Sequence, residues 1–327
     1  MLTDQFNRLH TYLRVSLTDK CNLRCTYCNP IDLPKGYFSQ TNKMSVDEID
    51  AIIGVFVQQG IKKIRLTGGE PLVRKDAKEI MMRLSKYPVE LAITTNGVFV
   101  HEFIETFKQA GIRSVNVSLD SLNPKRNLII TGRDEYDTVR RNIDLLLENN
   151  FHVKINTVIM ADVNAPEIPD FIALTRDHPV HVRFIEFMPF SGNHWNKGKL
   201  FTLDEMLSLI GSSYDYIPLH NDPHDTALKY KVPGFMGTFA IISTMSRPFC
   251  GGCNRLRLTT DGKMKNCLFS KTEADILSAL RNGDDILPLI KECVWNKAEA
   301  LGGQFTSVDK NLDSTTIINR SMINIGG

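Results

Sequence analysis

The chain has 327 residues, of which 42% are hydrophobic and 23% charged, enough to bury one large core or two ordinary ones. A formal net charge of +2 argues against a strongly basic nucleic-acid-binding protein. Its N-terminus carries no apolar segment of signal-peptide length, and no run approaches the roughly 18 apolar residues of a membrane span. We therefore expect a cytoplasmic protein with neither a membrane nor a nucleic acid as partner.

Short apolar runs alternate with helical patterns over the first 188 residues. This pattern predicts strands at residues 13–17, 63–67, 91–95, 114–119, 152–160 and 181–188. Helices are expected at 45–59, 76–85, 102–110, 136–149 and 165–176, and a further one at 202–210. Ser45 and Glu48 have the spacing of a capping box at the start of the first helix.

Strands that alternate with helices favour an α/β fold with a parallel sheet. Six such units are fewer than the eight of a closed barrel, so we expect an incomplete (βα)6 barrel over residues 1–225. A C-terminal region with β structure, residues 226–327, follows a polar break at 221–225. Ligands should gather at the carboxyl ends of the barrel strands.

A first cysteine triplet follows the first predicted strand with the spacing C-x3-C-x2-C: Cys21, Cys25 and Cys28. Three thiolates from one loop can hold three irons of a [4Fe-4S] cluster and leave the fourth iron open. An open iron can chelate the amino and carboxylate groups of S-adenosylmethionine (SAM), and Tyr27 could contact its adenine. The alternative is structural zinc, which takes four ligands. No fourth cysteine or histidine follows nearby.

Two further segments agree with a SAM site. The sequence Thr-Gly-Gly-Glu-Pro at 67–71 follows the second predicted strand, and residues 116–120 end the fourth. Together with the triplet they resemble the radical SAM superfamily. The resemblance implies that Gly69 lies in the segment that binds the SAM amino group and that Ser118 contacts the SAM ribose or carboxylate. Glu70 is expected to orient the ammonium, and a polar strand end is the alternative for Ser118.

A second triplet has the spacing C-x2-C-x13-C: Cys250, Cys253 and Cys267. It could hold a second open [4Fe-4S] cluster whose spare iron binds substrate. A zinc site completed by Cys293 or a histidine is the alternative. Arg255 and Arg257 project to one face of an extended segment, which suggests an anionic or electron-rich ligand.

Four cations lie on predicted barrel strands: Lys63, Arg65, Lys154 and Arg183. Cations that face into a barrel are costly unless a ligand or an acid neutralises them. Lysine and arginine bind phosphate through charge-assisted hydrogen bonds, so a triphosphate is one such ligand. Exposure or pairing with acids is the alternative. The chain has no P-loop motif, which argues against a hydrolytic nucleotidase.

The whole chain resembles the GTP 3′,8-cyclase family of molybdenum cofactor biosynthesis, whose members are radical SAM enzymes. The matching segments are residues 14–21, 64–72, 94–97, 116–120, 183–188 and 249–267, and the terminal Gly326-Gly327. The resemblance implies a radical SAM barrel with two [4Fe-4S] clusters. It also implies removal of the C3′ hydrogen of GTP and formation of a C3′–C8 bond, giving 3′,8-cyclo-7,8-dihydro-GTP.

The resemblance also implies residue roles. SAM would contact Tyr27, Gly69, Ser118 and Met188. GTP would be bound by Arg14, Arg65, Thr94, Lys154, Arg255 and Arg257, with Lys63 and Arg183 as further candidates, and its guanine by the free iron of the second cluster. Among these, Arg14, Arg255 and Arg257 are the expected catalytic residues. The C-terminal tail would reach into the active site.

The expected partners are GTP, an external one-electron donor and a downstream cyclic pyranopterin monophosphate synthase, and a homodimer is possible. Two other interpretations stay open. One is a different radical SAM enzyme with an auxiliary cluster, such as a peptide-modifying one, and the other is a non-enzymatic iron–sulfur or zinc protein.

Overall fold

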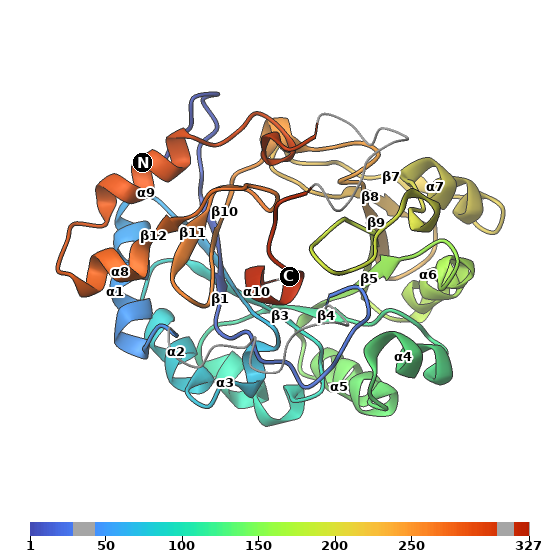
Figure 1. The fold of residues 1–327 in the computed structure, drawn as a ribbon. Coiled ribbons are helices and arrows are strands. Elements are labelled where there is room, and N and C mark those ends of the chain that lie inside the picture. The colour runs from blue at the N-terminus through green and yellow to red at the C-terminus, as the bar shows by residue number, and fades with distance from the viewer. Residues whose placement is uncertain (29–42, 306–316, 327) are drawn as a thin grey trace.

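The computed structural model describes residues 1–28, 43–305 and 317–326, and its centre is a curved wall of parallel strands (Figure 1). Six of the strands described follow in chain order: β1 (Tyr12–Ser16), β2 (Lys63–Thr67), β3 (Glu90–Thr95), β4 (Ser114–Ser118), β5 (His152–Ile159) and β6 (His181–Glu186). Each pairs in parallel with the next. The predicted (βα)6 barrel is therefore confirmed, with strand ends within two residues of expectation.

Helices cover the outside of this wall (Figure 1): α1 (Val46–Gln58), α2 (Ala77–Leu84), α3 (Ile104–Gln109), α4 (Pro124–Thr131), α5 (Tyr136–Glu148), α6 (Ile168–Asp177) and α7 (Leu203–Gly211). The capping box at Ser45 and Glu48 is present. Helix α4 was not predicted. Its Leu128 and Ile129 are 42% and 72% exposed, so it lacks the clear apolar stripe that indicates a surface helix.

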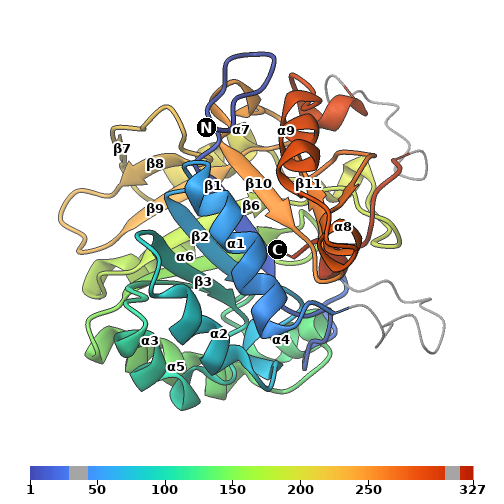
Figure 2. The same cartoon turned by 90° about the vertical axis from the view of Figure 1, so that its left-hand side faces the viewer.

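The C-terminal region extends both edges of the same sheet. It contributes β7 (Ile217–Pro218), β8 (Leu228–Lys231), β9 (Thr238–Ile242), β10 (Arg255–Leu258), β11 (Lys263–Lys265) and β12 (Ala274–Asp275), and the helices α8 (Ile276–Arg281), α9 (Leu287–Trp295) and α10 (Met322–Ile325). Strand β9 pairs in parallel with β6 and β10 in parallel with β1. Figure 2 shows β10 beside β1 with α1 in front.

The resulting strand order in the described part of the chain is β12-β11-β10-β1-β2-β3-β4-β5-β6-β9-β8-β7. Residues on both sides of the predicted boundary at 225/226 thus share one sheet, and the division into two domains stays a prediction. The end of the chain turns back into the barrel, where α10 lies at the centre of the view in Figure 1. This topology places the second triplet beside β1, the strand that precedes the first triplet, and the C-terminal tail beside the ends of β1 and β2.

Candidate active site

A first cavity lies at the carboxyl ends of the barrel strands, beside the first cysteine loop. The residues predicted to bind the first cluster and SAM all line it: Cys21, Cys25, Cys28, Tyr27, Gly69, Ser118 and Met188. They come from the loops after β1 and β2, the end of β4 and the segment after β6. The fold thus brings these seven side chains and backbone segments to one place.

The Gly68-Gly69 turn packs directly on the first cysteine loop. A Cβ atom at Gly69 would lie 2.5 Å from the carbonyl oxygen of Lys20, and Gly68 has φ +151°. The Gly69 amide donates to the carbonyl of Thr18 at 2.6 Å. Only glycine permits so close an approach. The turn therefore helps to hold the loop that carries the three thiols.

Glu70 connects the segments that follow β2 and β3 at this end of the barrel. Its carboxylate is fully buried and accepts hydrogen bonds from the Leu72 amide, the Thr95 hydroxyl and the Asn96 amide at 3.0, 2.8 and 2.6 Å. Burial raises the pKa of Glu70 to about 7. Its oxygens bind the loops after β2 and β3, and Glu70 does not line the cavity, so the expectation that it orients the SAM ammonium stays a prediction.

The chemistry of the first triplet suits an iron–sulfur cluster. Burial raises the pKa of Cys21 to about 11 and that of Cys28 to about 12, and Glu70 and Cys21 respectively add to the two shifts. Thiols of this kind become thiolates only beside a positive partner, which iron supplies. Among the described residues no three His, Cys, Asp or Glu side chains converge on one metal position. A [4Fe-4S] cluster does not require such convergence, because each thiolate binds a different iron.

Tyr27 and Asp120 form a polar pair in the wall of the first cavity. The Tyr27 hydroxyl donates to Asp120 Oδ2 at 2.7 Å, and the Val158 amide donates to Asp120 Oδ1 at 2.9 Å. Burial raises the pKa of Asp120 to about 6. Asp120 thus adds an acceptor at the end of β4 to the residues expected to bind SAM.

A second cavity combines the second triplet with the strand cations. Its lining contains Arg14, Lys63, Arg65, Lys154, Arg183, Arg255, Arg257, Cys250, Cys253 and Cys267. The sheet register explains the grouping, because Arg257 lies opposite Arg14 and Arg14 opposite Arg65 on β10, β1 and β2. Residues that are directly opposite on neighbouring strands share a face. Three guanidinium groups therefore form a row across the inner face.

Most of these cations lack an acidic partner. Lys63 pairs with Glu90 at 2.6 Å, but none of the other six forms an ion pair within the part of the chain that the structure describes. Burial lowers the pKa of Arg14 to about 10, of Arg183 to about 9 and of Lys154 to about 8, and neighbouring cations contribute to each shift. So much unneutralised positive charge is costly unless an anionic ligand binds there.

Unpartnered polar atoms mark the same space. Arg14 Nε, Arg255 Nε and Asn116 Oδ1 are buried without a hydrogen-bond partner among the described residues. Such atoms are uncommon in proteins and point to an absent ligand or water. Tyr12, which the sequence analysis missed, also lines the cavity and accepts from Arg65 Nε at 2.6 Å. Burial opposes its ionisation, but Arg65 and Arg14 lower the pKa of Tyr12 to about 7.

Thr94 is the one predicted GTP ligand that lies elsewhere. It lines the first cavity together with the first triplet, and its buried hydroxyl has no partner among the described residues. Its role toward GTP stays a prediction, and the geometry places it nearer to the expected SAM site.

The second triplet has a different electrostatic environment from the first. Burial alone would raise the pKa of Cys253, but Arg255 and Lys297 lower it to about 6. Arg255 Nη2 lies 4.0 Å from Cys253 Sγ. The lowered pKa favours the thiolate of Cys253, and a thiolate is the form of cysteine that binds iron. The residues present therefore fit a second cluster beside the cation row.

The two cavities meet at a shared wall. Asn156, Ile185, Met188 and Met322 line both of them. Asn156 Oδ1 accepts from Arg183 Nε at 2.8 Å, which ties the wall to the cation cavity. Met322 belongs to α10, so the C-terminal tail itself separates the expected SAM site from the expected GTP site.

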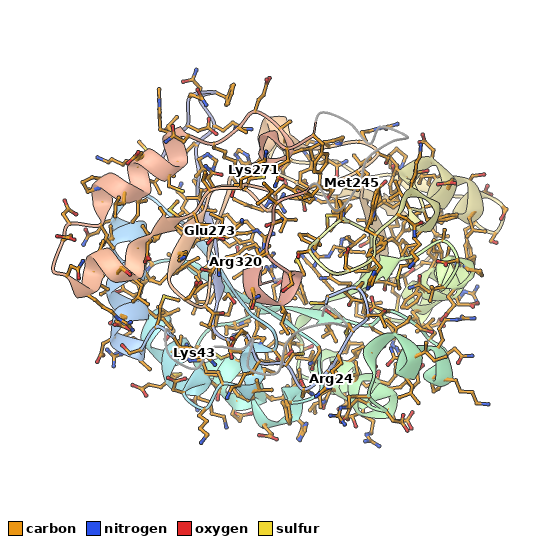
Figure 3. The ribbon with its side chains drawn as sticks, in the orientation of Figure 1. Arg24, Lys43, Met245, Lys271, Glu273 and Arg320 are labelled. Carbon is orange, nitrogen blue, oxygen red and sulfur yellow. The ribbon has the colours of Figure 1, made fainter. Side chains whose placement is uncertain are left out.

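The tail is anchored at both ends of α10. Arg320 forms ion pairs with Asp261 at 2.9 Å and with Glu273, and Figure 3 shows Arg320 and Glu273 side by side. Beyond α10, Arg257 Nη1 donates to the carbonyl oxygen of Gly326 at 2.6 Å. Gly327 lies outside the described residues. The tail is thus tied to one of the three predicted catalytic arginines.

Two family models match the chain. Residues 15–175 match the Radical SAM superfamily, and residues 180–302 match Molybdenum Cofactor Synthesis C. "GTP 3′,8-cyclase, mitochondrial" of Arabidopsis thaliana is 44% identical over 100% of this chain and 84% of that protein. "GTP 3′,8-cyclase" of Alkaliphilus oremlandii is 38% identical over the full length of both. The chain spans about half of the human "Molybdenum cofactor biosynthesis protein 1" (49%), with 40% identity.

Solved structures agree in fold. Streptococcus suis SuiB superposes with a TM-score of 0.64 at 14% identity, over 91% of this chain and 69% of that one. SuiB bound to S-adenosylmethionine gives a TM-score of 0.61 at 15% identity, over 94% of this chain and 72% of that one. At such low identity the likeness concerns the fold alone.

Proposed function

The chain belongs to the GTP 3′,8-cyclase family of radical SAM enzymes, and from this membership we propose the reaction that it catalyses. It removes the hydrogen at C3′ of GTP and joins C3′ to C8 of the guanine. A one-electron reduction and protonation then give 3′,8-cyclo-7,8-dihydro-GTP, an intermediate of molybdenum cofactor biosynthesis. The observation that carries this proposal is the cavity that six unneutralised cations line together with the second cysteine triplet, adjoining the cavity of the first triplet.

Each cavity has its own part in the reaction. When bound, SAM and the cluster of the first triplet supply a 5′-deoxyadenosyl radical. Residues of the first cavity, Tyr27, Gly69 and Ser118, hold SAM, and the apolar side chains of Met188 and Met322 lie between SAM and the nucleotide. Such a wall shields the radical from solvent and so prevents side reactions.

The cations of the second cavity hold the nucleotide. Arg65, Lys154 and Arg183 bind the triphosphate through charge-assisted hydrogen bonds, which fix the ribose relative to the first cavity. Arg14, Arg255 and Arg257 lie nearer the second triplet in the strand register and position the guanine end and the tail. The protein's own contribution is thus placement and charge, while the cofactors supply the radical chemistry.

The decisive experiment is an anaerobic reaction of the reconstituted protein with SAM, GTP and a strong reductant, followed by product identification. The proposal expects 5′-deoxyadenosine and the cyclised nucleotide in comparable amounts, with about eight irons per chain for two four-iron clusters. A protein that cleaves SAM but leaves GTP unchanged, and modifies a peptide instead, would favour the rival peptide-modifying interpretation. A colourless zinc protein would contradict both.

Lys154 and Lys63 offer a matched test of the triphosphate site. Lys154 has no acidic partner, whereas Lys63 is already neutralised by Glu90. Lys154→Ala should weaken GTP binding by about 1.5–3 kcal/mol, the range for a hydrogen bond to a charged group. Lys63→Ala should weaken it less, and neither change should alter SAM binding. Calorimetric titration measures the affinity of each variant for GTP and for SAM. Unchanged GTP affinities in both variants would refute the assignment of Lys154 to the triphosphate site.

GTP binding should also depend on pH. Lys154 has a pKa of about 8 in the free protein, because burial and then Arg183 and Arg65 disfavour its charged form. A bound triphosphate favours the charged form and raises that pKa. Affinity is therefore full below about pH 8 and falls as the pH rises above it, because the free protein must then take up a proton. Titrations between about pH 7.5 and 9.5 should show this fall, and Lys154→Met should reduce it. An identical fall in the variant would exclude Lys154 as its source.

The remaining partners are part of the proposal. An external one-electron donor reduces the first cluster, and a cyclic pyranopterin monophosphate synthase consumes the product. A homodimer, a cytoplasmic location and the absence of nucleic-acid partners stay predictions. Within the described residues no helix has both the length and the apolar composition to cross a membrane.

A further inference from the structure

A buried lysine lies against the second cysteine triplet. Lys297 follows α9 and is only 2% exposed. Its ammonium lies 3.5 Å from Cys253 Sγ and donates to the carbonyl oxygen of Arg255 at 3.0 Å. The second distance is that of an ordinary hydrogen bond, and the first is normal for a donor to sulfur. The ammonium is therefore held toward the sulfur by the β10 backbone.

The N-terminal segment closes over this lysine. Gln5 Nε2 donates to the carbonyl oxygen of Lys297 at 3.3 Å. Arg8 donates to the carbonyl oxygens of Cys250, Ala298 and Glu299 at 3.0, 2.8 and 2.6 Å. One guanidinium group thus joins the first cysteine of the second triplet to the segment that follows Lys297. The lysine and the triplet are fixed to each other by backbone contacts on both sides.

The charge of Lys297 has no carboxylate partner. Among the described residues no Asp or Glu forms an ion pair with it, and the nearby Asp4 is engaged by Arg8 at 2.7 Å and His10 at 3.0 Å. A buried cation is costly unless an anion or a full set of acceptors compensates it. The acceptors within reach are one carbonyl oxygen and the sulfur of a cluster ligand. The positive charge of Lys297 is therefore better compensated when the second triplet holds an assembled cluster than when it holds none.

We propose that Lys297 is a positioning residue of the second cluster, whose hydrogen bond to the Cys253 sulfur raises the reduction potential of that cluster. This inference rests on the proposed function, which places a [4Fe-4S] cluster on the second triplet. A cation and an N–H donor at a ligand sulfur stabilise the reduced, more negative cluster over the oxidised one. The potential of a cluster follows its hydrogen bonds and surrounding charge, so loss of the ammonium must lower it.

The first triplet provides the internal contrast. Its Cys21 sulfur accepts from neutral donors, the Leu23 amide at 3.4 Å and Asn96 Nδ2 at 3.8 Å. Within residues 1–28, 43–305 and 317–326 no lysine or arginine is hydrogen-bonded to a sulfur of the first triplet. A change at Lys297 should therefore act on the second cluster and leave the first unaffected.

The test is a redox titration followed by electron paramagnetic resonance. It uses the full chain, reconstituted with iron and sulfide, with Cys21, Cys25 and Cys28 replaced by alanine so that only the second cluster reports. Lys297→Met removes the charge and the donor while it keeps an unbranched apolar stem. Lys297→Arg keeps both. Lys291→Met is the matched control, because it makes the same change on the exposed face of α9, the helix that Lys297 follows.

The inference expects about four irons per chain in each protein. The midpoint potential should shift to more negative values in Lys297→Met, stay close to the parent in Lys297→Arg and be unchanged in Lys291→Met. A cluster that Lys297→Met loses and Lys297→Arg retains would also support it. An unchanged potential in Lys297→Met, or loss of iron from both Lys297 variants, would overturn the inference and leave the proposed function standing. A parent protein without any cluster would overturn the proposed function itself.

Discussion

Replacement of Cys25 by alanine should abolish SAM cleavage, whereas replacement of Cys253 should leave some SAM cleavage and no cyclised nucleotide. The two sulfurs line different cavities, one with Tyr27 and the Gly68-Gly69 turn and the other with the arginine row. A [4Fe-4S] cluster with only two protein thiolates is not stably held. Each variant should therefore lose one cluster, or about four irons. The Cys25 variant should lose SAM cleavage, and the Cys253 variant should lose cyclisation.

The measurement is anaerobic turnover with separate quantification of 5′-deoxyadenosine and cyclised GTP, together with iron content. Cys293→Ala is the matched control. Cys293 belongs to neither triplet and lines neither cavity, and its thiol donates to the Met264 carbonyl oxygen at 3.8 Å. It should retain about eight irons and coupled turnover. Normal cyclisation by the Cys253 variant would contradict the assignment of the second triplet.

Local patterns in the sequence were sufficient for the barrel and for much of both cavities. The alternation of apolar and polar residues predicted β1 to β6, and on β2 it also placed both cations on one face. Lys63 and Arg65 share a face for this reason, with the fully buried Ile64 between them facing the other way. The two triplets were recognisable because their ligands lie close together in the chain.

Contacts between segments that are far apart in the chain could not be predicted from the sequence. Nothing local indicates that β10 pairs with β1, yet that pairing aligns Arg257 with Arg14 and completes the arginine row. The same holds for Met322, which reaches the wall between the cavities only because the tail folds back. Tyr12 carried a usable signal, since it lies on the same face of β1 as Arg14, two residues away. Lys297 carried none, because its contact with Cys253 joins residues 44 positions apart.

Gly326 offers the sharpest test of the C-terminal tail. Its carbonyl oxygen accepts from Arg257, its φ is +82°, and a Cβ atom there would lie 2.5 Å from Thr67 Oγ1 and 3.1 Å from the Ser16 Cβ. These residues end β1 and β2, so neither can move without the barrel. Gly326→Ala must therefore displace the tail from Arg257 and from the wall between the cavities.

Cyclisation by Gly326→Ala should fall by about a hundredfold, the cost of roughly 1 Å of misplacement in an active site. SAM cleavage should continue and become uncoupled from product, because the first cavity keeps its cysteine loop and its Gly-Gly turn. Gly283→Ala is the matched control: its φ is +81°, and a Cβ atom there meets nothing within 4 Å. It imposes the same backbone strain at an exposed turn that lines neither cavity. A ratio of cyclised GTP to 5′-deoxyadenosine that falls in Gly326→Ala and stays at the wild-type value in Gly283→Ala would assign the effect to the tail's position. Equal ratios in both variants would show that the reaction does not require the tail where the structure places it.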